Sequence, residues 1–330
     1  MNAIVLAGGF GSRLKPLTDD CPKPMLPLAN RPMLDYVVSQ LNHFGIREII
    51  FTLGYKAEKV RAHASGYKGI DVKFICEDTP LGTAGAVKNA EEMLDDVFFV
   101  MSGDALSNVN LNEMLLQHLR TQADVTIATV KRDDVNKYGV IQTNNNQKVM
   151  QLIEKPSTNK YGNKVNAGIY LINKKVLMQI PKGVKFDFSC DLFPKLIESG
   201  TVFSYSHDGY WCDIGDKNSY YDANYYVLEG GFYNFVPHNI DRNINTIKQG
   251  NLVSNSAITV GRFRNSIVGQ GVMISSNAVI NECIVMPNVV VGGKHERCII
   301  GDNYVERLEK TAVLPPNITQ KANKILANGV

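Results

Sequence analysis

A glycine-rich stretch near the start of the chain, GGFGSRL at residues 8–14, is the first feature that could do chemistry. Gly8, Gly9 and Gly11 can turn their backbone N–H groups toward one point, and such a concavity binds an anion well. Three cationic side chains follow closely in the sequence, Arg13, Lys15 and Lys23. The pattern predicts a site for a phosphate-rich ligand such as a triphosphate, and a tight structural turn flanked by surface cations is the alternative.

Two well-known phosphate-binding motifs do not fit this stretch. A P-loop requires G-x-x-x-x-G-K-[ST], and no GK[ST] occurs here. A dinucleotide-binding fingerprint needs a third glycine where Leu14 stands, and no acidic residue closes the apolar run at 48–53 to bind a ribose. The glycine stretch therefore belongs to neither motif.

Alternating apolar and helical segments must position the glycine stretch. Short runs of β-branched and aromatic residues at 3–7, 48–53 and 97–101 alternate with amphipathic segments at 34–44 and 84–94. This alternation predicts a mostly parallel sheet with helices on its faces. Ligands of such sheets bind at the carboxyl ends of the strands, so GGFGSRL and the SGD that follows 97–101 are expected to meet there.

Later apolar runs no longer alternate with helices. The runs at 125–130, 138–143, 149–154 and 166–172 follow one another with turn-rich stretches between them, which indicates some antiparallel pairing. From 251 to 305, single Ile or Val positions recur every five or six residues with Asn or Gly between them. This period is typical of a parallel β-helix, whereas a β-sandwich would show strict alternation over longer strands.

Composition and charge give no support to a nucleic-acid or membrane partner. The 330 residues carry 35 basic and 32 acidic side chains in mixed order, a net charge of only +3, so nothing favours nucleic acid or a membrane surface. The first apolar run is shorter than the ~7–15 residues of a signal peptide, and no run approaches the ~18 that span a bilayer. Six cysteines without a C-x-x-C pair favour reduced thiols, so a cytoplasmic location is expected.

The glycine stretch is part of a longer pattern, G-G-x-G-[ST]-R-L-x-P-L-T followed by P-K-P-M-L-P. With EDTPLGTAGAVKNA, SGDAL, EKP, NAGIY and DGYWCDIGD, it resembles the nucleoside diphosphate-sugar pyrophosphorylases over about residues 1–230. The resemblance implies an α/β fold with a Rossmann-like mixed-sheet nucleotidyltransferase domain at 1–230. It also implies a linker at 231–250, and a short left-handed parallel β-helix of hexapeptide repeats with a C-terminal tail at 251–330.

The resemblance also implies an activity and a role for individual residues. A sugar 1-phosphate would attack the α-phosphorus of a nucleoside triphosphate and release pyrophosphate, a reaction that relies on positioning and charge neutralisation. Arg13 and Lys23 are the expected catalytic residues. The nucleotide is expected to contact Leu6, Ala7, Gly8, Gly9, Gly11, Gly82 and Thr83. The sugar phosphate is expected to contact Gly139, Glu154, Lys155 and Asn166. Magnesium is the expected cofactor, held by Asp104 and Asp213.

The substrates and some roles stay open at this point. PKP and PLGTAG look most like mannose-1-phosphate guanylyltransferases, which make GDP-mannose from GTP and mannose 1-phosphate. Uridylyl or adenylyl transfer to glucose 1-phosphate and guanylylation of a heptose phosphate are alternatives, because a few pocket residues can set the choice. A non-catalytic regulatory subunit is another, and an acyltransferase would have to use His295. Asp104 could instead serve a turn and Thr83 a helix cap. The β-helix is expected to pack the chain or to form a homo-oligomer.

Overall fold

The computed structural model describes residues 1–77, 79–229, 245–248 and 250–308. The chain divides into two units, each built from more than one stretch of sequence. The first unit contains residues 1–10, 22–24 and 40–213. The second unit contains residues 11–21 and 25–39 and the chain from 214 onward.

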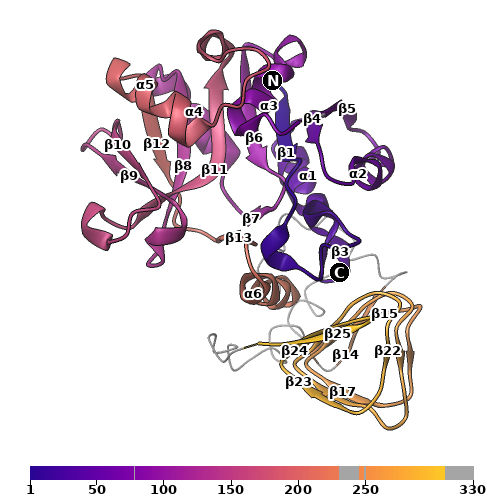
Figure 1. Cartoon of the computed structure of the whole chain (residues 1–330). Coiled ribbons are helices and arrows are strands. Elements are labelled where there is room, and N and C mark those ends of the chain that lie inside the picture. The colour runs from indigo at the N-terminus through magenta and orange to yellow at the C-terminus, as the bar shows by residue number, and fades with distance from the viewer. Residues whose placement is uncertain (78, 230–244, 249, 309–330) are drawn as a thin grey trace, which may run out of the picture. The chain divides into compact units, whose positions relative to one another are not determined.

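A nine-stranded mixed sheet forms the framework of the first unit (Figure 1). Four adjacent strands are parallel to one another, namely β1 (Ala3–Ala7), β4 (Glu48–Leu53), β5 (Asp71–Cys76) and β6 (Val97–Ser102). The other five are β8 (Val125–Lys131), β9 (Gly139–Thr143), β10 (Val149–Glu154), β11 (Lys164–Asn173) and β12 (Val202–Ser206). The main path runs β10-β9-β11-β6-β1-β4-β5, and β8 pairs with β11 and β12.

Strand β11 joins the two halves of this sheet. It pairs antiparallel with β6 on one side and with β8 and β9 on the other. The predicted α/β fold with a mixed sheet is therefore confirmed, and the antiparallel pairing lies where the sequence loses its alternation. The runs of β1 and β6 are continuous apolar segments because both faces of these strands are buried, as the consecutive buried residues Ile4 and Val5 show.

Amphipathic helices connect the strands, and α4 shows how the sequence starts one. Asn110 precedes it, and its side-chain oxygen accepts hydrogen bonds from the backbone N–H groups of Asn112 and Glu113, both at 3.1 Å. The buried face of α4 carries Leu111 and Met114, and Figure 1 shows the helix beside β8 and β12. The helices are α1 (Met33–His43), α2 (Ala57–Ala64), α3 (Gly82–Asn89), α4 (Leu111–Thr121) and α5 (Phe193–Ser199).

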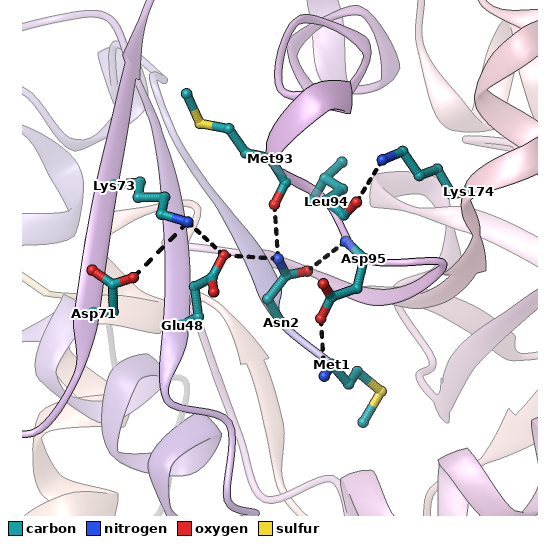
Figure 2. Close-up of polar contacts among 9 residues, drawn as sticks. All are labelled: Met1, Asn2, Glu48, Asp71, Lys73, Met93, Leu94, Asp95 and Lys174. Carbon is teal, nitrogen blue, oxygen red and sulfur yellow. Dashed lines mark hydrogen bonds and ion pairs between the residues drawn. The ribbon is translucent and has the colours of Figure 1, made fainter.

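A polar network closes the amino ends of β1, β4 and β5 (Figure 2). The Asn2 side-chain amide donates to Glu48 Oε1 at 3.1 Å and to the Met93 carbonyl at 2.8 Å. Lys73 Nζ lies 2.8 Å from Glu48 Oε1 and 3.9 Å from a carboxylate oxygen of Asp71. The hydrogen bonds from Lys73 and Asn2 lower the pKa of Glu48. This edge lies opposite the carboxyl ends of the same strands.

Three ladders of short parallel strands form stacked coils in the second unit (Figure 1). One ladder is β15 (Asn251–Ser254), β18 (Ile267–Val268), β21 (Ile284–Val285) and β24 (Cys298–Gly301). The second is β16 (Ile258–Thr259), β19 (Met273–Ile274) and β22 (Val290–Val291). The third is β17 (Arg262–Arg264), β20 (Val279–Asn281) and β23 (Lys294–Glu296).

Aliphatic residues stack inside these coils, as the hexapeptide pattern predicts. Val268 pairs in register with Val285, which in turn pairs with Ile300, and all three belong to the buried core of the coils. Helix α6 (Lys217–Leu228) belongs to the same unit and begins with a capping box between Asp216 and Ser219. Its Tyr221 hydroxyl donates to the Glu282 carbonyl at 2.8 Å. The predicted β-helix is therefore confirmed as parallel stacked coils.

The ends of the β-helix region differ in detail from the expected segments. Residues 245–248, within the expected linker, form β14 (Asn245–Lys248), which pairs antiparallel with β15. The first residues of the expected tail form β25 (Tyr304–Arg307), which folds back on β24. Both added strands cover an edge that a coil would otherwise expose. The other linker residues, 231–244 and 249, and residues 309–330 of the tail lie outside the described residues. Among the described helices, none has the length and apolarity needed to cross a membrane.

Candidate functional site

The glycine stretch begins where β1 ends, at the carboxyl edge of the sheet. Gly8 packs closely on Gly54, the residue that follows β4: a Cβ on Gly54 would lie only 2.8 Å from the Gly8 carbonyl oxygen. The backbone N–H of Gly103, in SGD, donates to the Leu6 carbonyl at 2.9 Å. The structure thus brings the start of GGFGSRL and the SGD turn together, as expected for two loops at the carboxyl ends of strands in one sheet.

Lys23 lies at this edge between two carboxylates. Only 6% of the residue is exposed, and its Nζ lies 2.6 Å from Asp104 Oδ2 and 3.5 Å from Asp213 Oδ1. Two short antiparallel strands, β7 (Ala105–Ser107) and β13 (Trp211–Asp213), hold the acids near each other, because Asp213 pairs with Ala105. Three residues predicted to act on phosphates and metal therefore meet, although more than 80 positions separate Lys23 from either aspartate in the sequence.

The lysine keeps this cluster charged. Burial by itself raises the pKa of Asp104, but the Lys23 ammonium and a hydrogen bond from the Ser102 hydroxyl outweigh it, so the pKa lies below its ordinary value. At neutral pH, Asp104 is a carboxylate. The cluster can therefore neutralise a cation, and Lys23 already supplies one positive charge there.

The donor set at this position fits a magnesium ion that also binds phosphate. No group of three or more potential His, Cys, Asp or Glu ligands occurs among the described residues, so these parts of the chain offer no all-protein metal cage. Mg²⁺ commonly binds through one or two carboxylates, with water and substrate phosphates completing its shell. Asp104 and Asp213 match that requirement.

A second group of predicted residues gathers at the ends of β9, β10 and β11. Glu154 pairs in register with Gly139, and a Cβ on Gly139 would lie 2.9 Å from Glu154 Oε2 and 3.8 Å from Asn166 Cβ. Glycine at 139 thus lets the carboxylate approach the backbone. Lys155 follows with a positive φ of 44°, and its Nζ lies 3.5 Å from Glu154 Oε1. All four residues expected to contact the sugar phosphate are therefore close to one another.

Asn166 is held by three hydrogen bonds. Its amide nitrogen donates to the Tyr170 hydroxyl at 3.0 Å and to Ser189 Oγ at 3.2 Å, and its oxygen accepts from the Gly168 N–H at 2.9 Å. Tyr170 is buried, which raises its pKa to about 12, so its hydroxyl stays protonated. Sequence reasoning missed Tyr170 and Ser189, which orient Asn166.

Trp211 joins the two groups. Its indole N–H donates to the Ala167 carbonyl at 2.8 Å, next to Asn166, while Asp213 stands two positions along the same strand. Tyr138 packs edge-on against the Trp211 ring, with centroids 5.2 Å apart. Burial, and then the charges of Asp134 and Asp213, raise the pKa of Tyr138. A tryptophan inside the motif YWCDIGD was the available signal for this connection.

The start of α3 is engaged with a distant segment. The Thr83 N–H and hydroxyl both donate to Asp187 Oδ1, at 3.0 and 3.1 Å. Gly82 has a φ of +72°, and a Cβ there would lie 2.8 Å from the Phe186 carbonyl oxygen. The chain therefore needs these residues for its own packing, and their contact with a nucleotide stays a prediction. Sequence reasoning missed Asp187.

Gly11 and Arg13 belong to the second unit of the chain. Gly11 adopts a left-handed φ of 62°, and its carbonyl accepts from the Leu14 N–H at 3.0 Å and the Thr18 hydroxyl at 2.9 Å. Leu14 is buried, whereas Arg13 is exposed in the 3-10 turn Ser12–Leu14. The buried Leu14 thus fixes one side of the turn, while Arg13 on the other side is accessible to solvent.

Comparison with known families decides how these groups are interpreted. A family model for nucleotidyl transferases matches residues 2–230. The chain belongs to the nucleotidyl transferase family. A second family model, for the GlmU-like C-terminal hexapeptide region, matches residues 234–313. This nucleotidyl transferase therefore carries a hexapeptide region after its family domain.

Several curated relatives resemble this nucleotidyl transferase at moderate identity. A mannose-1-phosphate guanyltransferase of Yarrowia lipolytica is 34% identical over 230 residues, 67% of this chain and 62% of the relative. A mannose-1-phosphate guanylyltransferase of Mycobacterium tuberculosis is 30% identical over 302 residues, 88% of this chain and 81% of the relative. A UTP–glucose-1-phosphate uridylyltransferase of Synechocystis is 33% identical over 241 residues, 68% and 62% of the two chains. The match thus spans less than two thirds of the first and third relatives.

Solved structures give the same picture of the fold. HddC from Yersinia pseudotuberculosis, crystallised with GMP-PN, is 32% identical and superimposes with a TM-score of 0.59. The match covers 68% of this chain and 97% of HddC. It supports the mixed-sheet nucleotidyl transferase fold described above.

Proposed function

We propose that the protein transfers a nucleoside monophosphate from a nucleoside triphosphate to a sugar 1-phosphate and releases pyrophosphate. One observation carries this proposal: in a member of the nucleotidyl transferase family, the Lys23 ammonium lies between Asp104 and Asp213 at the carboxyl edge of the sheet. Gly8 and the SGD turn are at the same edge. Such an edge is where sheets of this kind bind ligands.

The residues divide the work of the transfer between two anions. Backbone N–H groups of Gly8, Gly9 and Gly11 and the side chain of Arg13 bind the nucleotide phosphates. Lys23 stabilises negative charge as the bond from the α-phosphorus to pyrophosphate breaks and the sugar phosphate oxygen attacks. Leu6, Ala7, Gly82 and Thr83 contact the nucleoside.

The acceptor binds at the second group of residues. The Glu154 carboxylate accepts hydrogen bonds from two sugar hydroxyls, and Lys155 meets the phosphate. Asn166 is held in place by Tyr170 and Ser189, so its orientation is fixed before the sugar arrives. Gly139 leaves the space that the carboxylate needs. Holding both reactants in one geometry supplies much of the catalysis.

Magnesium is the proposed cofactor, and Asp104 and Asp213 would hold it. When bound, it neutralises phosphate charge as a Lewis acid. Asp104 is ionised at neutral pH and therefore ready to bind a cation.

The proposed substrates are GTP and mannose 1-phosphate. Two relatives with this activity in their names support them, and the GMP-PN bound to HddC supports a guanine nucleotide. The Synechocystis relative supports UTP and glucose 1-phosphate as the alternative. A regulatory subunit is a further alternative, but the complete Lys23–Asp104–Asp213 cluster favours an enzyme. A cytoplasmic location stays a prediction.

We also propose that the β-helix mediates homo-oligomerisation. Three residues at one register position of successive coils, Ile258, Met273 and Val290, are exposed at 56%, 42% and 68%. An apolar row of this kind suits contact with a second copy. Sedimentation of the wild type and of a Val290→Lys variant tests this, and a monomeric wild type would overturn it.

The proposed activity is tested by pyrophosphate release from the purified protein with Mg²⁺. GTP, UTP, dTTP, ATP and CTP are each combined with mannose 1-phosphate and glucose 1-phosphate. We expect the fastest release with GTP and mannose 1-phosphate. A faster reaction with another pair would replace the proposed substrates, and no release with any pair would favour an unusual sugar phosphate or the regulatory subunit.

A further inference from the structure

We propose that the segment Phe186–Asp191 positions both substrates, with Asp187 orienting the nucleoside-binding motif at the start of α3 and Ser189 orienting Asn166. This inference rests on the proposed function. Neither residue is expected to touch a substrate, so each acts as a positioning residue. The sequence around them, FDFSCD, belongs to none of the motifs from which the site was predicted.

On the nucleotide side, the segment occupies the amino end of α3. Asp187 Oδ1 accepts from the Thr83 N–H at 3.0 Å and from the Thr83 hydroxyl at 3.1 Å. The Thr83 hydroxyl in turn accepts from the Phe188 N–H at 3.0 Å. The Phe186 carbonyl accepts from the N–H groups of Ala84 and Gly85, both at 2.9 Å. Three N–H groups at the start of α3 are thus satisfied within the chain.

This arrangement has a chemical consequence for what binds there. A helix N-terminus attracts anions because its free N–H groups carry partial positive charge. At α3, the Asp187 carboxylate already provides the negative charge. A nucleotide phosphate would compete with that carboxylate, whereas an uncharged base or ribose would not. The PLGTAG motif therefore contacts the nucleoside, and the glycine stretch binds the phosphates.

The glycines of PLGTAG fit the same account. A Cβ on Gly82 would lie 2.8 Å from the Phe186 carbonyl oxygen, and a Cβ on Gly85 would lie 2.8 Å from the Val184 carbonyl oxygen. Both contacts are with backbone atoms, which cannot move aside as a flexible side chain can. The glycines are therefore required by the docking of the 184–188 backbone onto α3.

On the sugar side, the same segment reaches Asn166. Ser189 Oγ lies 3.2 Å from the Asn166 amide nitrogen and accepts its hydrogen bond, beside the one from Asn166 to Tyr170. Asp187 and Ser189 are only two positions apart, so one short segment contacts motifs more than 80 residues apart, Thr83 and Asn166.

The segment is rigid enough to hold this geometry. Residues Phe188–Leu192 form a π-helical turn, a rare conformation that often occurs at functional sites. Phe188 is buried and stacks on Phe193, with ring centroids 5.3 Å apart, and packs against Tyr170 at 5.2 Å. The Asp187 N–H donates to Asp191 Oδ2 at 2.7 Å. Side chains on either side of Phe188 are thereby fixed in direction.

The test separates the two Michaelis constants. With the full-length protein, Asp187→Ala is expected to raise the KM for the nucleotide about five- to tenfold and to leave the KM for the sugar phosphate unchanged. Ser189→Ala is expected to do the reverse. Asp187→Asn keeps an oxygen acceptor and should restore most of the nucleotide affinity. Ser199→Ala serves as the matched control and should change neither constant, because the Ser199 hydroxyl contacts the Leu196 carbonyl at 2.8 Å and the Thr201 hydroxyl at 3.3 Å, away from Thr83 and Asn166 in the sequence.

A second variant covers the case in which Asp187→Ala does not fold. Thr83→Val removes the hydroxyl that Asp187 and Phe188 share, and it should also raise only the KM for the nucleotide. Equal rises in both constants, or no rise in either, would overturn the inference. An inactive wild-type protein would instead overturn the proposed function, so the two failures are distinguishable.

Discussion

The Lys23 ammonium nitrogen lies 2.6 Å from Oδ2 of Asp104, in a position where only 6% of the lysine is exposed. A buried lysine held this closely needs its carboxylate partner, and the carboxylate needs the lysine. The pair therefore keeps a positive and a negative charge together where a triphosphate and a divalent cation are proposed to bind. Phosphates would bind the ammonium, and the cation would bind the carboxylate.

The first prediction concerns Lys23 itself. Lys23→Met should lower turnover by about 100-fold or more, because it removes a fixed positive charge from the developing pyrophosphate. It should also tighten the binding of Mn²⁺ without nucleotide, since the ammonium and the metal ion compete for Asp104. Pyrophosphate release measures the first effect, and titration of free Mn²⁺ by electron paramagnetic resonance measures the second.

Lys73→Met is the matched control. Lys73 also lies between two carboxylates, those of Glu48 and Asp71, but at the amino ends of the strands (Figure 2). This variant should keep both turnover and Mn²⁺ binding. Equal effects of the two substitutions would show that Lys23 acts through general stability.

The second prediction concerns the metal ligands. Asp104→Asn and Asp213→Asn should each weaken Mn²⁺ binding more than about tenfold, because each removes a charged oxygen ligand. Asp95→Asn, at the N-terminal ion pair with Met1, should leave it unchanged. Mn²⁺ titration with nucleotide present measures all three. An aspartate whose asparagine variant binds Mn²⁺ as the wild type does is not a ligand.

The third prediction compares two glycines with the same φ of +72°. Gly82→Ala places a methyl group 2.8 Å from the Phe186 carbonyl, whereas Gly69→Ala meets no atom within 4 Å. Both alanine variants are destabilised by the left-handed backbone, so the difference in their unfolding free energies isolates the clash with Phe186. Gly82→Ala should lose about 1–3 kcal/mol more unfolding free energy than Gly69→Ala in urea titrations. Equal losses would mean that Phe186 moves away freely.

The fourth prediction concerns pH. His118 is buried, with Nδ1 2.8 Å from the Thr126 hydroxyl and Nε2 3.2 Å from Asn173 Oδ1. Burial lowers its pKa, and hydrogen bonding to Asn173 and the charge of Asp124 oppose this only partly. The unfolded chain therefore binds a proton more readily than the folded chain does. The stability from neutral His118 is present above the ordinary value of 6.5 and falls as pH drops below it, by at most about 1.4 kcal/mol per pH unit.

Urea titrations at pH 7.5 and 5.5 check this expectation. The wild type should lose stability between the two values, and His118→Gln should lose less. His207, whose pKa is also lowered by burial, accounts for part of the remaining loss. An identical loss in the wild type and in His118→Gln would contradict the assignment to His118.

The alternation of strands with helices and the repeat period were predictable from the sequence because both are local patterns. Apolar runs such as 3–7 and 97–101 placed Gly8 and Asp104 at one edge, and the spacing of Ile267 and Ile284 indicated stacked coils. The resemblance to a known family assigned Glu154 and Asn166 to one site, and in the structure both lie next to Gly139.

Contacts made across the fold were not predictable in the same way. Asp187 meets Thr83 across 104 positions, and neither residue belongs to a periodic pattern that pairs them. The sequence does not distinguish Ser189 from other serines, and its side chain meets Asn166 only because of the π-helical turn. Strand β14 forms only because β15 offers an unpaired edge, which the sequence of 245–248 does not show by itself.

The most direct test of the account follows the α-phosphate. GTP labelled at its α-phosphate is incubated with mannose 1-phosphate, Mg²⁺ and either the wild type or Asp104→Asn, with labelled UTP and glucose 1-phosphate as a parallel reaction. We predict that the wild type moves the label into a nucleotide sugar and leaves pyrophosphate unlabelled, and that Asp104→Asn does so at least about 100-fold more slowly. Label that stays in the triphosphates, or equal transfer by both proteins, would contradict a transfer site built on Lys23, Asp104 and Asp213.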